Sequence, residues 1–219
     1  GVYGEATGKK LVYRVIADCA CRNNQVYDEW LVRDQGAIIR QLGFDLKKYA
    51  AKLIYYEGGI NICPIPFNQD TLNNVPLEGV YKAPTISKEN TGTRYAHILK
   101  QIFNKDSNTV DKNYDRAIQQ EQPGGFTGHG KEEITNFWNT LISAFPDSKF
   151  NIEHISFTDE KNQSKKAAIR WSLIGSHSGM GNFGKPSNAP VYIMGISHAE
   201  FGPRGIKNEW VLFDEIIIW

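Results

Sequence analysis

The sequence predicts an α+β fold in which helices come first and a run of hairpinned strands follows. Two stretches with apolar residues at helical spacing, 92–104 and 131–145, precede four stretches with the composition of strands. A second observation is an internal repeat, because the opening of the chain matches its last stretch without a gap when Gly1 is aligned with Gly181. Helices followed by neighbouring strands are typical of α+β domains, and so long a repeat indicates domain duplication.

The repeat divides the chain into three predicted segments. Pairs at one constant offset connect the two copies: Gly1 with Gly181, Gly4 with Gly184, Glu29 with Glu209, Trp30 with Trp210 and Asp34 with Asp214. The first copy corresponds only to the second half of the later one. We therefore expect an incomplete first domain over 1–43, a helix and an extended linker over 44–87, and a complete domain over 88–219.

The helices of the complete domain are predicted from their apolar stripes. Residues at helical spacing mark both long helices: Tyr95, Ile98, Leu99, Ile102 and Phe103 in the first, and Ile134, Phe137, Trp138, Leu141, Ile142 and Phe145 in the second. Pro146 ends the second helix. Between them we expect a short helix over 110–114 and an extended segment with a Pro-Gly-Gly turn over 116–130. An earlier helix is predicted over 46–56.

Four strands are predicted next: 149–158, 165–175, 190–200 and 206–218. The last two flank a loop with Gly202, Pro203 and Gly205, which indicates a hairpin. Side chains in a strand alternate between faces, so Asn208, Trp210 and Asp214 share one face. The hairpin can bring His198 beside them. An apolar face that carries an aspartate and a histidine is a candidate pocket lining.

Several motifs together resemble a known family. They are GNFGKPS, the run KEEITNFWNTLISAFPDSKFNI after a glycine, the strand AAIRWSLIGSHSG, and a Glu-Trp pair followed by aspartate. This combination resembles the SnoaL-like polyketide cyclases, over residues 88–219 and, separately, over 1–43. The resemblance implies the cone-shaped fold of nuclear transport factor and scytalone dehydratase, with helices packed on a strongly curved antiparallel sheet around an enclosed pocket.

The resemblance also implies two catalytic residues in the complete domain. His198 matches a position at which these cyclases carry a catalytic histidine. Asp214 lies on a strand expected to face the pocket, where burial would raise its pKa and suit it to general acid or base catalysis. Alternatively, Asp214 is a hydrogen-bonded aspartate that holds a loop at a strand end, and His198 is a core histidine.

Further side chains are candidates for binding the substrate: Trp210, Asn208, Arg170, Trp171, His177 and Trp138. Arg170 and Trp171 are adjacent in one strand, so only one of them faces the pocket. In the first copy Asp34 and Trp30 keep the positions of Asp214 and Trp210, but Asp18 stands where His198 stands in the second copy. Catalysis by the first copy is therefore in doubt.

Composition and motifs exclude several classes of function. The chain of 219 residues has a formal net charge of +1 and no basic run, which argues against nucleic-acid binding. No stretch approaches the roughly 20 apolar residues of a membrane span. Cys19, Cys21 and Cys63 lack metal-site spacing, and we predict reduced cysteines and a cytoplasmic protein. No nucleotide-binding loop or metal-ligand cluster appears, so we expect neither cofactor nor metal.

Two functions from different classes fit these observations. The first is a cofactor-free cyclase or isomerase, in which Asp214 and His198 move a proton at a carbon next to a carbonyl of a small apolar or polyketide-like ligand. The second is a non-catalytic module of the same fold for ligand binding or dimerisation. They are distinguished by whether both side chains point into one cavity. The incomplete first domain also predicts a homodimer, or an intrachain pseudo-dimer in which it covers the outer face of the complete domain.

Overall fold

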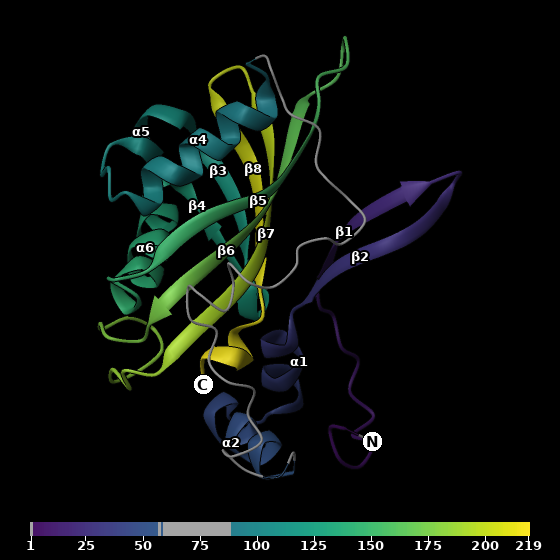
Figure 1. Cartoon of the computed structure of the whole chain (residues 1–219), viewed down its shortest axis with the longest axis vertical. Coiled ribbons are helices and arrows are strands. Elements are labelled where there is room, and N and C mark those ends of the chain that lie inside the picture. The colour runs from purple at the N-terminus through teal and green to yellow at the C-terminus, as the bar shows by residue number, and fades with distance from the viewer. Residues whose placement is uncertain (1, 57, 59–88) are drawn as a thin grey trace.

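The computed structural model describes residues 2–56, 58 and 89–219, and its elements form three layers (Figure 1). Helices α4 (Thr91–Phe103), α5 (Thr109–Asn113) and α6 (Gly130–Ala144) lie on one face of a six-stranded sheet. A hairpin from the start of the chain lies on the other face. The predicted linker falls outside the described residues from residue 59 onward, and Cys63 with it.

The sheet is mixed, with the strand order β4-β3-β8-β7-β6-β5. Its members are β3 (Tyr114–Gln122), β4 (Phe126–His129), β5 (Lys149–Thr158), β6 (Lys165–Ser176), β7 (Pro190–Gly202) and β8 (Gly205–Phe213). Strands β5 to β8 pair antiparallel in sequence order, as predicted. Strand β3 runs parallel to β8 and pairs antiparallel with β4. The predicted α+β class is confirmed, but the sheet is not purely antiparallel.

The helices pack on the sheet through the predicted apolar stripes. Helix α4 begins at Asn90, whose side chain accepts the Thr93 backbone N–H while the Thr93 hydroxyl bonds back to Asn90, a capping box. The core between helices and sheet contains residues from the helices and from most strands, among them Leu99, Ile102, Trp138, Ile169, Trp171, Leu173 and Val211. Burial of this face, more than helix propensity, holds the helices in place.

Two predicted segments differ in the structure. Residues 116–130 form β3 and β4, joined by the single-turn helix η2 (Pro123–Gly125), and not merely an extended segment. The predicted last strand ends at Phe213, and Glu215–Ile218 form the 3₁₀ helix η3. The Asp214 carboxylate accepts the Ile216 backbone N–H and so caps this helix. This cap favours a helical turn over Glu215–Ile218, although the isoleucines there have the composition of a strand.

The first copy forms the hairpin β1 (Val15–Arg22) and β2 (Gln25–Arg33), followed by α1 (Gln35–Leu42) and α2 (Leu46–Tyr56). Asn23 and Asn24 connect the strands with φ of +51° and +59°. Such a two-residue loop with positive φ at both positions suits the twist of a hairpin, and asparagine tolerates it. Strands β2 and β8 lie at equal positions in the two copies of the sequence repeat.

The hairpin packs on the face of the sheet that the helices leave uncovered. Its side chains Ile16 and Val32 meet Met194, Ile196 and Leu212 of β7 and β8 in a small apolar cluster. Beside it, α1 and α2 pack against η3 in a second cluster made by Ile39, Leu46, Ala50 and Ile216. Both faces of the sheet are thus covered, at least in part, by apolar contacts.

Polar contacts fix the hairpin and α1 in this position. The Asp34 carboxylate accepts the backbone N–H groups of Gly124 at 2.8 Å and Gly125 at 3.0 Å, in addition to that of Ala37 in its own helix at 3.0 Å. Arg40 forms a two-pronged ion pair with Glu215. We call the contact of Asp34 with the Gly124–Gly125 turn the aspartate latch.

Candidate functional site

A buried carboxyl group lies at the centre of the core between helices and sheet. Glu209 of β8 accepts hydrogen bonds from the hydroxyls of Tyr95 at 2.7 Å and Tyr114 at 2.8 Å, and from the Gln120 side-chain amide at 2.6 Å. Burial raises the pKa of Glu209, and the three donors offset this only in part, so that its pKa is about 7. The Glu209 carboxyl group therefore has a pKa near neutral pH although it has no contact with solvent.

Two predicted site residues lie in the same core. Trp171 is fully buried and donates from its indole N–H to the Ser197 hydroxyl at 2.9 Å. Trp138 of α6 is buried as well and contacts Phe103, which stacks on Phe150 with ring centroids 4.0 Å apart. Trp171, and not its neighbour Arg170, therefore faces the helices. The rings of Phe103, Trp138, Phe150 and Trp171 contact one another in the core where the enclosed pocket was expected.

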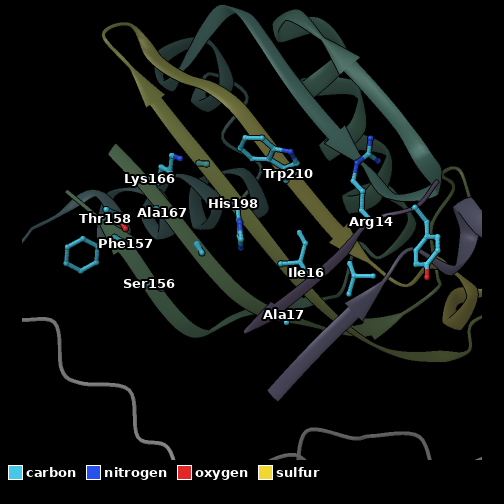
Figure 2. Close-up of a pocket in the computed structure, with 14 residues that line it drawn as sticks. Arg14, Ile16, Ala17, Ser156, Phe157, Thr158, Lys166, Ala167, His198 and Trp210 are labelled. Carbon is cyan, nitrogen blue, oxygen red and sulfur yellow. The ribbon is translucent and has the colours of Figure 1, made fainter. Parts of the chain in front are cut away.

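His198 and Trp210 lie on the opposite face of the sheet, which corrects the prediction that they face the helices. They are directly paired between β7 and β8, as the hairpin predicted. From residue 209 onward, the residues of β8 that enter the helix-covered core are those of the other parity, Glu209, Val211 and Phe213. Figure 2 shows His198 and Trp210 on neighbouring strands with Ile16 and Ala17 of β1 near them.

These two residues line a cleft of about 810 Å³ between β1 and the sheet (Figure 2), which we call the hairpin cleft. Its apolar lining includes Ile16, Phe157, Ala168 and Trp210. Its polar lining includes Arg14, Ser156, Thr158, Lys166 and His198. Both copies of the repeat therefore contribute to one concave site.

The imidazole of His198 is half-buried in this cleft. Burial lowers the pKa of His198, and the negative charge of Asp18 opposes that effect without overcoming it. The ring is consequently neutral at pH 7. A neutral imidazole presents one hydrogen-bond donor and one acceptor, so His198 can bind a polar ligand atom of either kind.

A neighbouring cleft of about 520 Å³ is lined by two further predicted residues, Asp18 and Arg170. Asp18 accepts a hydrogen bond from Arg170 Nε at 2.8 Å and contacts His154 Nδ1 at 2.9 Å. The Arg170 guanidinium lies 4.0 Å from the centre of the Trp30 ring. Burial pushes the pKa of Asp18 upward, but the hydrogen bonds from His154 and Arg170 outweigh it and lower the pKa. These contacts join the first copy to the second.

Asp214 is not among the described residues that line either cleft. Its carboxylate caps η3 through the Ile216 backbone N–H at 3.0 Å. Burial raises the pKa of Asp214 to about 6, since one N–H compensates little of the lost hydration. The predicted partners Asp214 and His198 thus lie in different surroundings, and neither of these two clefts is lined by both.

The remaining predicted residues lie away from the hairpin cleft. The Asn208 side-chain amide donates to Glu200 at 2.9 Å. His177 is buried beside Phe145, and its Nδ1 lies 3.3 Å from the Ser187 hydroxyl. Sequence reasoning missed the Glu209 cluster, although Glu209 belongs to the repeated Glu-Trp pair and its parity, opposite to that of Trp210, was available.

Two negative findings apply to the described part of the chain. Within residues 2–56, 58 and 89–219, no three histidine, cysteine, aspartate or glutamate side chains gather in a way that could hold a metal ion. None of the helices in the same ranges has the length and apolar character needed to cross a membrane.

The helix-covered sheet and its hairpinned strands define an α+β cone. Comparison with protein families assigns it further: residues 93–218 match SnoaL-like polyketide cyclase, which is more than half of the chain. The protein belongs to this family. The family resemblance proposed from the sequence is confirmed for residues 93–218. A comparison with curated proteins gave no match.

The chain is also similar to several solved structures. A SnoaL-like polyketide cyclase from Jannaschia sp. CCS1 has 14% identity over 59% of this chain and 91% of its own, with a TM-score of 0.48. One from Shewanella denitrificans OS-217 has 20% identity over 59% of this chain and 95% of its own, with a TM-score of 0.46. IdmH from Streptomyces antibioticus has 14% identity, 59% and 96% coverage and a TM-score of 0.47.

Proposed function

We propose that this chain binds a small apolar ligand in the hairpin cleft and does not use Asp214 and His198 as an acid/base pair. The observation that carries the proposal is the separation of these two residues. His198 and Trp210 line the cleft, whereas Asp214 caps a helix outside it. A proton relay needs both groups within hydrogen-bonding reach of one substrate, directly or through water.

The hairpin cleft has the properties of a small-molecule site. Its volume of about 810 Å³ falls within the range of roughly 300–1,000 Å³ that is typical of ligand pockets. Aromatic and aliphatic side chains provide apolar surface, and a few polar groups converge on it. His198, with its lowered pKa, is such a group. These features support binding and do not by themselves supply a reaction.

The first copy supports a structural role for Asp214. Asp34, its counterpart in the repeat, is buried and forms the aspartate latch. An aspartate at this strand end therefore caps the following helix in both copies. We propose the same capping role for Asp214, which was one of the two alternatives left open by the sequence.

The Glu209 cluster favours a second candidate function, cofactor-free acid/base chemistry inside the cone. A carboxyl group with a pKa of about 7 exchanges protons readily at neutral pH. The phenols of Tyr95 and Tyr114 beside it are donors of the kind that stabilise an enolate oxygen. Because Glu209 already accepts three hydrogen bonds and is buried, a substrate would have to displace some of its partners. We therefore rank this candidate second.

Displacement of an apolar fluorescent dye tests the proposal. Ala168 is half-buried on the cleft wall, so Ala168→Trp should fill the cleft and weaken dye binding by tenfold or more. Ala189→Trp, at an exposed position outside the cleft, is the matched control and should bind like the parent. Undiminished binding by Ala168→Trp would refute the proposed site. Loss of binding on Glu209→Gln, with Ala168→Trp unaffected, would favour the second candidate.

The proposal includes the relation between the two copies. We propose that the packing of the hairpin on the sheet is an intrachain pseudo-dimer, supported by the Ile16–Val32 cluster and the aspartate latch. A homodimer and a cytoplasmic location remain predictions from the sequence.

A further inference from the structure

We infer that the ligand of the hairpin cleft is an amphipathic monoanion, with an apolar body and one carboxylate that is held at Lys166. This inference rests on the proposed function and specifies its ligand class. Four observations support it. They are the strand register of the sheet residues that line the cleft, the positive charge of the lining, the lack of a partner for the Lys166 ammonium among the described residues, and the neutral imidazole of His198.

The wall of the cleft is one row of side chains across four strands. Ser156 of β5 pairs with Ala168 of β6, Ala168 with His198 of β7, and His198 with Trp210 of β8. Lys166 pairs with Thr158 in the adjacent row on the same face. The ammonium and the hydroxyls therefore lie toward β5 and β6, and the indole lies at β8. The site is polar at one end and aromatic at the other.

The charge of the lining is positive. Arg14 and Lys166 are its cations, and no carboxylate is found among its described lining residues. Arg14 is neutralised in part, because it pairs with Glu121 and donates to the Gln122 carbonyl. Lys166 has no hydrogen bond or ion pair to any residue in 2–56, 58 or 89–219. Among the described lining residues, Lys166 is therefore the cation that a ligand can pair with.

The carboxylate nearest in register to Lys166 is already engaged. Glu200 pairs with Lys166 across β6 and β7, but it accepts a hydrogen bond from Asn208 at 2.9 Å and forms an ion pair with Lys207 at 3.2 Å. The Glu200 carboxylate is thus paired with two residues of β8, Lys207 and Asn208, and not with Lys166. A ligand carboxylate at Lys166 would gain an ammonium partner and would face the donor hydroxyls of Ser156 and Thr158.

The rest of the cleft suits an apolar body. From Lys166 on β6 to Trp210 on β8 the wall spans two strand spacings across the sheet and two residues along it, about 12 Å in all. Ile16 of β1 also lines the cleft and adds aliphatic surface opposite the sheet. Because His198 in its middle is neutral at pH 7, it offers a hydrogen bond without a second charge. One anionic head and an apolar chain match this pattern.

Calorimetric titration with octanoate and with its neutral analogue octanamide tests the inference. The parent should bind octanoate about tenfold more tightly than octanamide, as expected for a charge-assisted hydrogen bond. Lys166→Met should remove this preference and leave octanamide binding unchanged. Lys165→Met, the neighbouring residue on the opposite face, is the matched control and should keep the preference.

The outcomes separate this inference from the proposed function. Equal affinity for the two compounds in the parent, with both lost in Ala168→Trp, overturns the anionic ligand and keeps the site. A preference for octanoate that survives Lys166→Met also overturns the inference. If neither compound binds the parent, or if Ala168→Trp binds both as the parent does, the proposed function fails and the inference with it.

Discussion

Replacing Asp34 with alanine should destabilise the protein far more than the same change at its repeat counterpart Asp214. The Asp34 carboxylate accepts three backbone N–H groups, from Ala37, Gly124 and Gly125, and is 1% exposed. The Asp214 carboxylate accepts one, from Ile216. Asp34 and Asp214 are therefore the same residue type at the same position of the two copies, but their carboxylates accept different numbers of hydrogen bonds.

The magnitude follows from the contacts that are lost. Loss of the helix cap costs about 1 kcal/mol. The buried Gly124 N–H, left without a partner, adds roughly 1–3 kcal/mol, whereas Gly125 is exposed and its N–H can bond to water. We therefore expect a total of about 2–4 kcal/mol for Asp34→Ala. For Asp214→Ala we expect a change within about 1 kcal/mol, because the lost cap is offset by removal of a poorly hydrated carboxylate.

Urea unfolding at pH 7, followed by tryptophan fluorescence, measures both changes. Hydrogen exchange of the β1 and β2 amides shows whether the loss appears as release of the hairpin. Asp34→Asn is an intermediate case, because its amide keeps one acceptor oxygen for the glycine turn and should lose less than the alanine variant. Equal destabilisation by Asp34→Ala and Asp214→Ala would refute the aspartate latch.

Three further predictions concern titratable groups. The pKa of Glu209 is raised from 4.5 to about 7, so the folded state binds this proton more tightly than the unfolded state does. The free energy of unfolding should therefore fall by on the order of 3 kcal/mol as pH rises through that window. Glu209→Gln should not show this fall when its unfolding is measured over the same pH range. Asp214, raised from 3.8 to about 6, should add a similar fall between those values, which Asp214→Asn removes in the same pH series. Asp18 has a lowered pKa, so its stabilisation is present above its ordinary pKa and is lost in acid; Asp18→Asn should cost about 1–3 kcal/mol at pH 7 and little in strong acid, by the same unfolding assay.

The sequence predicted most of the complete domain. Both long helices were found from their apolar stripes, and the β7–β8 hairpin brought His198 beside Trp210 as expected. Strand β3 was missed because its run of glutamine residues hides the alternation of a strand, and its parallel partner β8 lies far away in the sequence. Pairing between distant segments is not visible in a local pattern.

The candidate site shows what a periodic pattern leaves open. Alternation correctly placed Trp210 and Asn208 on one face of β8 but did not say which face the helices cover. The outer face also looked apolar, since Ile196 and Leu212 pack there against the hairpin. Asp214 follows the strand, where period two no longer applies. The Glu209 cluster depends on partners from α4 and β3 that only the tertiary fold assembles.

The central claim is that the ligand binds between the hairpin and the sheet and not inside the cone. The chain has 5 tryptophans, whose indole N–H groups give separate NMR signals that single substitutions can assign. Titration with octanoate should shift the signal of Trp210 and leave those of Trp138 and Trp171, which are buried in the core, in place. Shifts of Trp138 and Trp171 with Trp210 unmoved would place the ligand within the cone and contradict the account.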